Sequence, residues 1–149
     1  MKKLLIFALV TILLVAGITN SGSAQALAAH AEAAPVYLQF DKTIVDSAGI
    51  WQGTVSGDLN GNLTTVLTYL RISGPIWHVE FDWIIEADPQ SFTAHLTGIL
   101  NTKTGHVAMN GVVTEGWLLG AQVHEEGQMV DPDTLRFQGT IQVMPGTAD

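Results

Sequence analysis

Apolar stretches and clusters of turn-forming residues alternate along the chain after Pro35. Eight apolar stretches of about ten residues each cover 36–45, 49–59, 62–73, 76–86, 92–100, 106–114, 117–124 and 134–143. None of them repeats its apolar residues at the helical period of about 3.6 residues. Short strands at even spacing, with turn signals between them, are typical of an all-β sandwich or barrel.

The clearest predicted strand is residues 77–85, WHVEFDWII. Its odd-numbered positions are large and apolar, whereas most positions between them are polar. The apolar set is Trp77, Val79, Phe81, Trp83 and Ile85, and the polar set is His78, Glu80 and Asp82. This alternation indicates a strand with one buried face. Covering so large an aromatic face requires a partner sheet or a closed barrel.

Turn positions predict the pairing of this strand with the two that follow. The predicted pairs are Ile85 with Phe92, Trp83 with Ala94, Phe81 with Leu96, Val79 with Gly98, Leu100 with Val107, Gly98 with Met109 and Leu96 with Gly111. In this register the apolar residues of three strands share one side, and a slip of one residue destroys that agreement. Small residues face large ones, as in a curved, filled barrel. We therefore predict an eight-stranded antiparallel up-and-down β-barrel.

Residues 56–64, SGDLNGNLT, place oxygen-bearing side chains at alternate positions, as a calcium-binding loop does. An EF-hand loop needs glycine at its sixth position and a carboxylate at its twelfth. Counting from the aspartate, these positions hold Leu63 and Tyr69. Asn60-Gly61 is instead a strong signal for a type I′ hairpin. We predict a hairpin here and no metal site.

The first residues have the layout of a secretory signal peptide: two lysines, the apolar run 4–18, then small residues. Cleavage after Ala26 and cleavage after Ala28 both fit. The predicted organisation is a signal peptide at 1–28, a flexible leader at 29–35, a β-barrel domain at 36–145 and a tail at 146–149. We therefore expect a secreted or periplasmic protein.

Removing Lys2 and Lys3 with the signal peptide leaves four cationic residues against fourteen acidic ones, a net charge of −10 with histidine neutral. Such a surface repels phosphate groups, so we expect no nucleic-acid partner and no membrane association after cleavage. The chain has no cysteine, which excludes disulfides.

No nucleophile, metalloprotease, P-loop or dinucleotide motif occurs in the sequence. The predicted register places Asp82 opposite His95, with Glu80 and His78 nearby. An Asp–His pair can orient a general base or begin a metal site. These residues share the face opposite the tryptophans, however, where the same pair is an ordinary cross-strand contact.

Residues 124–133 form the longest predicted connection, and His124, Glu125 and Glu126 open it. Long loops at a barrel end commonly carry binding residues or a lid. A solvated acidic loop is the alternative.

Aromatic residues are the third candidate set, because they can line an apolar pocket inside the barrel. They are Trp51, Tyr69, Trp77, Phe81, Trp83, Phe92, Trp117 and Phe137. An eight-stranded barrel is just wide enough either to be filled by such side chains or to hold one small ligand.

Three stretches carry a resemblance to known barrels: WQGTVSGDLNG, FTAHLTGILNTKTGHVAMNGVV and FQGTIQV. Over residues 36–145 the chain resembles small exported bacterial β-barrel proteins without an assigned function, and the barrel of allene oxide cyclases and dirigent proteins. A lipocalin-like calycin barrel is the alternative, on the spacing of Gly49-Ile50-Trp51. No catalytic residue of these families maps onto this chain.

The expected function is an exported barrel that binds a small apolar molecule in its interior, or isomerises or cyclises one without a cofactor. A non-catalytic structural or interaction protein with a packed core is the alternative. We expect no cofactor and no metal. Whether the protein is an enzyme, and whether it forms homo-oligomers, stays open.

Overall fold

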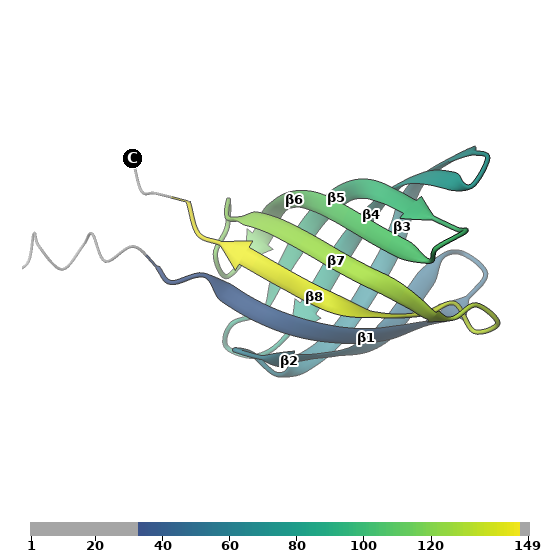
Figure 1. Ribbon diagram of the computed structural model, residues 1–149. Helices are drawn as coiled ribbons and strands as arrows, with labels where there is room; N and C mark the ends of the chain where they lie inside the picture. Colours follow the sequence, from purple (N-terminus) through teal and green to yellow (C-terminus); the bar gives the residue numbers. More distant parts are fainter. Residues whose placement is uncertain (1–32, 147–149) are drawn as a thin grey trace, which may run out of the picture. The chain divides into compact units, whose positions relative to one another are not determined.

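The structure is a computed structural model, and it describes residues 33–146. The strands are β1 (Val36–Asp46), β2 (Ile50–Gly57), β3 (Gly61–Ser73), β4 (Ile76–Glu86), β5 (Phe92–Asn101), β6 (His106–Gly116), β7 (Gln122–Asp131) and β8 (Arg136–Met144). Each pairs antiparallel with the next, and β8 pairs with β1 to close an eight-stranded up-and-down barrel (Figure 1). The predicted all-β, eight-stranded antiparallel up-and-down barrel is confirmed. The predicted signal peptide lies outside the described residues.

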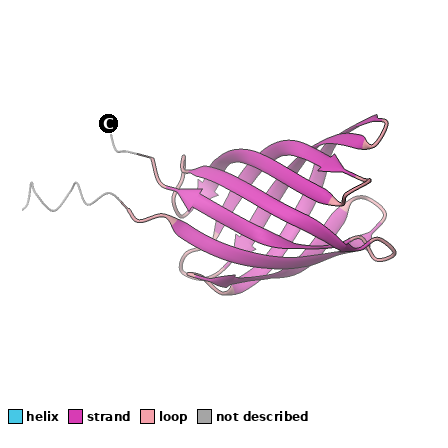
Figure 2. Cartoon of the chain, in the orientation of Figure 1, coloured by secondary structure: helices cyan, strands magenta, loops and turns pink. Residues whose placement is uncertain are grey.

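Turns connect the strands, and residues 33–146 contain no helix (Figure 2). Within that range, accordingly, no helix is long and apolar enough to cross a membrane.

Alternate residues of each strand face the barrel interior and form the hydrophobic core. Val79, Phe81, Trp83 and Ile85 of β4 are all buried, as predicted, and Trp83 is 1% exposed. The predicted pairs between β4 and β5 and between β5 and β6 are confirmed, including Trp83 with Ala94. The register is therefore fixed by matching large residues with small ones across neighbouring strands.

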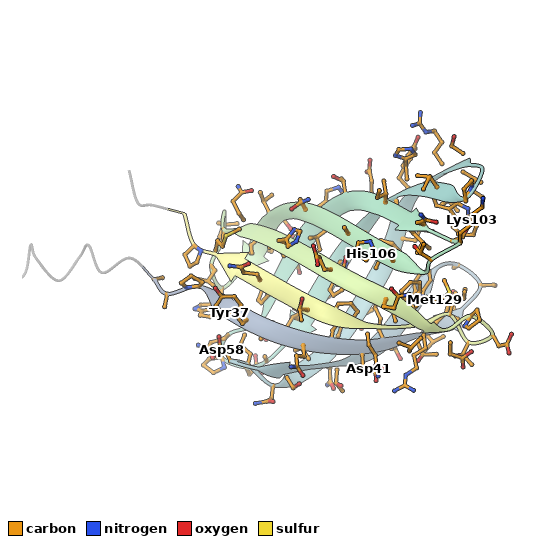
Figure 3. The ribbon with its side chains drawn as sticks, in the orientation of Figure 1. Tyr37, Asp41, Asp58, Lys103, His106 and Met129 are labelled. Carbon is orange, nitrogen blue, oxygen red and sulfur yellow. The ribbon has the colours of Figure 1, made fainter. Side chains whose placement is uncertain are left out.

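The β2–β3 connection is a hairpin, as predicted, but it is not a type I′ turn. Neither Asn60 nor Gly61 has a positive φ, whereas Gly57 has a φ of 121°. The reason lies in β1, because the Asp58 carboxylate accepts a hydrogen bond of 2.8 Å from the backbone N–H of Tyr37. The Asp58 N–H donates in turn to the Tyr37 carbonyl at 3.1 Å. Asp58 and Tyr37 lie at the same end of the barrel (Figure 3).

The predicted boundaries of the seventh strand are wrong. Residues 117–120 form a turn, and β7 runs from Gln122 to Asp131. Leu118 and Gly120 have φ values of 59° and 84°, so this apolar segment turns despite its strand-like composition. Residues 124–131 of the long loop predicted at 124–133 therefore belong to a strand, and only residues 132–135 connect β7 to β8.

Candidate functional site

One end of the barrel interior contains a cavity of about 120 Å³, which we call the end cavity. It lies at the end formed by the β1–β2, β3–β4, β5–β6 and β7–β8 turns. This end is on the right in Figure 1, opposite the end where β1 begins. Met129 lines the cavity, and Figure 3 shows it far from Tyr37 and Asp58. The other end is closely filled: Leu63, Ile85 and Val143 are at most 1% exposed.

The end cavity is apolar and reaches the surface. Its lining residues are Lys42, Trp51, Leu67, Leu70, Trp77, Val79, Phe81, Leu100, Thr102, Val107, Met109, Met129, Leu135 and Phe137. Leu70 and Thr102 are exposed and form part of the rim, whereas Phe81 and Met109 are buried. Only Lys42 and Thr102 in this lining are polar. A molecule that enters therefore meets apolar walls and a single charged side chain.

Lys42 is directed into the barrel by the alternation of β1. Phe40 and Lys42 both face inward, and Lys42 is only 4% exposed. Its Nζ donates a long hydrogen bond of 3.5 Å to Thr65 Oγ1. It lies 3.9 Å from the ring centre of Trp83, 5.0 Å from that of Phe81 and 5.5 Å from that of Phe40. These three rings, the aromatic cage, stabilise the ammonium group through cation–π interactions.

Glu125 is the second buried charged residue of the interior. It lies on β7, is 0% exposed, and neither carboxyl oxygen has a hydrogen-bond partner. The missing side chain of Gly127 makes room for it, because a Cβ at Gly127 would lie 2.9 Å from both Glu125 Oε1 and Phe40 Cζ. The indole Nε1 of Trp83 is likewise buried without a partner. Unpaired buried polar atoms are uncommon, because each costs desolvation free energy.

Burial moves the pKa values of both residues toward neutrality. It lowers the pKa of Lys42 from 10.5 to about 8, against the opposing effect of the Glu125 charge. It raises the pKa of Glu125 from 4.5 to about 8; the charge of Lys42 opposes this shift and that of Glu126 adds to it. No direct ion pair joins Lys42 to Glu125 among the residues of the barrel. The interior thus holds an amine and a carboxyl group that both exchange protons near neutral pH.

The predicted aromatic residues divide into groups. Trp51, Trp77, Phe81 and Phe137 line the end cavity, whereas Trp83, Phe92 and Trp117 do not. Phe92 and Trp117 contact each other with ring centres 6.5 Å apart.

Tyr69 is misplaced by the sequence prediction, because it is 46% exposed. A register shift between Leu67 and Tyr69 interrupts the alternation of β3. Tyr69 consequently pairs with outward-facing Glu80, while Leu70 pairs with inward-facing Val79 and lines the cavity.

Asp82 and His95 do meet, as predicted. His95 Nδ1 lies 2.8 Å from Asp82 Oδ1, and its Nε2 lies 3.7 Å from Glu80 Oε2. All three side chains are on the outer face of the barrel and 38–43% exposed. His78 shares this face, and in the described structure no hydrogen bond or ion pair joins it to the other three. This arrangement is that of a cross-strand surface contact.

The three residues predicted to open a loop lie on strand β7 and point to opposite sides. His124 and Glu126 face outward, with His124 Nε2 3.3 Å from Glu126 Oε1, whereas Glu125 faces the interior. His124 Nδ1 also lies 2.8 Å from Asn110 Oδ1. Over residues 33–146, no group of three histidine or carboxylate side chains is arranged to hold a metal ion.

Sequence reasoning missed Lys42 altogether. The signal was present in VYLQFDKTIV, where Lys42 is in phase with Val36, Leu38 and Phe40. A strict reading of the alternation places it inside.

In comparisons with known proteins, no protein-family model, no curated protein and no solved structure matches the chain. The residues and their geometry are therefore the basis for the functional argument.

Proposed function

We propose that the barrel binds, in the end cavity, a small molecule with an apolar body and one oxygen atom that accepts a hydrogen bond from Lys42. One observation carries the proposal: a cavity open at its rim and lined by apolar side chains also has a buried lysine, Lys42, in its lining. Concave apolar pockets with a few polar groups are the usual form of small-molecule sites.

The hydrogen-bonding state of Lys42 supports an oxygen-bearing ligand. An ammonium group has three donors, and its one hydrogen bond is the 3.5 Å contact with Thr65. A carboxylate or carbonyl oxygen at the inner end of the cavity would accept a second hydrogen bond. The volume of about 120 Å³ restricts the ligand to a small one, since pockets for drug-sized ligands have roughly 300–1,000 Å³.

Several finer expectations stay predictions. Export, the resemblance to allene oxide cyclases and dirigent proteins, and isomerisation or cyclisation without a cofactor are compatible with this proposal. The alternative, a non-catalytic protein with a fully packed core, is disfavoured by the end cavity. The titratable pair Lys42 and Glu125 supports proton-transfer chemistry more than catalysis by shape alone.

Calorimetric titration with hexanoate and 2-hexanone tests the proposal, with tryptophan emission as a second readout because Trp51 and Trp77 line the cavity. We expect both compounds to bind. Lys42→Met should weaken hexanoate binding about tenfold or more, since a charge-assisted hydrogen bond is worth about 1.5–3 kcal/mol. Lys103→Met is the matched control, because Lys103 is exposed and lies outside the lining. Absence of binding at millimolar concentration by the folded protein would overturn the proposal.

A further inference from the structure

We propose that Lys42 is a covalent binding site, at which Nζ condenses with the carbonyl group of a small apolar aldehyde or ketone to form an imine. This inference rests on the proposed function, because the carbonyl compound has to occupy the end cavity first. It adds to that function a reactive group and a chemical class of ligand.

Lys42 is one of the residues that line the cavity, and its Nζ lies against the aromatic cage. Phe81 lines the cavity and its ring centre is 5.0 Å from Nζ, whereas Phe40 and Trp83 are not part of the lining. The Lys42 amine therefore lies where the open part of the interior meets the filled part. An oxygen atom that accepts a hydrogen bond from Nζ also brings its carbonyl carbon close to the nitrogen.

Burial favours the neutral, nucleophilic form of this amine. Desolvation by the surrounding side chains lowers the pKa of Lys42, although the aromatic cage attracts the ammonium group. With a pKa of about 8 in place of 10.5, Lys42 has a fraction of free amine at neutral pH roughly three-hundredfold above that of an ordinary lysine.

The condensation balances without an oxidant or reductant. The Nζ lone pair forms a bond to the carbonyl carbon, and the π electrons move to oxygen. A proton then passes from nitrogen to oxygen and gives a carbinolamine. A second proton converts its hydroxyl group into a leaving water molecule, the C–O bond breaks, and the nitrogen lone pair forms the C=N bond. The protonated imine that results returns its N–H proton to water, and the net change is amine plus carbonyl compound to imine plus water.

Glu125 is not the source of the second proton. Its carboxyl group is fully buried, and it does not line the cavity. No hydrogen bond or ion pair joins it to Lys42 within the described barrel. Water at the open rim of the cavity therefore supplies this proton.

The chain provides an internal control for a labelling experiment. Residues 33–146 contain two lysines. Lys42 is buried inside the barrel, and Lys103 lies on its surface (Figure 3). The protein is incubated with hexanal and sodium cyanoborohydride, which reduces an imine to a stable secondary amine. Peptide mapping by mass spectrometry then measures the labelling rate at each lysine. We expect Lys42 to be labelled about tenfold faster than Lys103.

A competition measurement locates the reaction. Hexanoate should slow labelling of Lys42 and leave Lys103 unaffected.

The outcomes separate this inference from the proposed function. If hexanoate binds but Lys42 is labelled no faster than Lys103, the imine is refuted and the binding function stands. If neither hexanoate nor hexanal occupies the cavity, both fail. Labelling of Lys42 that hexanoate does not slow refutes an imine formed inside the cavity.

Discussion

Replacing Glu125 by glutamine is expected to stabilise the barrel near pH 8 and to change its stability little near pH 5. Burial raises the pKa of Glu125 from 4.5 to about 8. Between these values the folded protein retains a proton that the unfolded chain has released. The free energy of unfolding therefore falls as the pH rises through this window. Glutamine has the same shape as the protonated glutamic acid and no proton to lose.

The size of the effect follows from the shift. One pKa unit corresponds to about 1.4 kcal/mol. The change from 4.5 to about 8 thus removes on the order of 5 kcal/mol of stability, an upper value because the folded protein can rearrange around the charge.

Lys42 has the opposite dependence in a higher range. Burial lowers its pKa from 10.5 to about 8, so the folded protein binds fewer protons than the unfolded chain between these values. Stability rises with pH there, by on the order of 3 kcal/mol. Together, Glu125 and Lys42 give the wild-type protein a minimum of stability near pH 8.

Urea unfolding measured from about pH 5 to about pH 9 provides the assay, with the midpoint and slope fitted at each pH. Glu126→Gln is the matched control, because Glu126 is the next residue of β7 and its side chain is 59% exposed. The control should follow the wild-type profile within about 0.5 kcal/mol. A wild-type stability that rises steadily from pH 5 to pH 8, or an E125Q variant that is less stable than wild type at pH 8, would refute the reasoning.

Three shorter predictions concern the fold. Trp83→Ala should lower the free energy of unfolding by about 3–5 kcal/mol because Trp83 is 1% exposed. Glu80→Ala, on the outer face, should lower it by less than about 0.5 kcal/mol. Similar losses for both variants in urea unfolding would contradict the assignment of inside and outside. Gly61→Val should lower the free energy of unfolding by roughly 1 kcal/mol or more, because a Cβ at position 61 would lie 2.3 Å from the Glu86 carbonyl oxygen. An unchanged melting temperature would contradict this close approach. Added calcium should leave the melting temperature unchanged, and a clear rise would reveal a cation site.

The fold was largely predictable because its information is local. Period-2 alternation identifies strands, and the pairing of large with small residues, such as Trp83 with Ala94, fixes the register of β4 through β6. The errors arose where local composition misleads. The apolar residues 117–119 resemble a strand but form a turn, and the polar start of β7 resembles a loop.

The candidate site was only partly predictable. Four of the predicted aromatic residues line the end cavity, but its volume depends on how side chains from all eight strands fill one end. Lys42 and Glu125 are 83 positions apart in the sequence, and they share the interior because β8 closes the barrel between β1 and β7. Composition favours the surface for both residues, so only a strict alternation rule places them inside.

The closure of the barrel also makes the chain suitable for circular permutation. Val36 and Val143 are paired residues on adjacent strands, so a short linker can join β8 to β1 across the end opposite the cavity. New ends can then be opened in the β2–β3 turn at residues 58–60, which is at the same end as that linker. The rearranged protein would present the cavity mouth, free of any attachment, when either new end is coupled to a sensor surface.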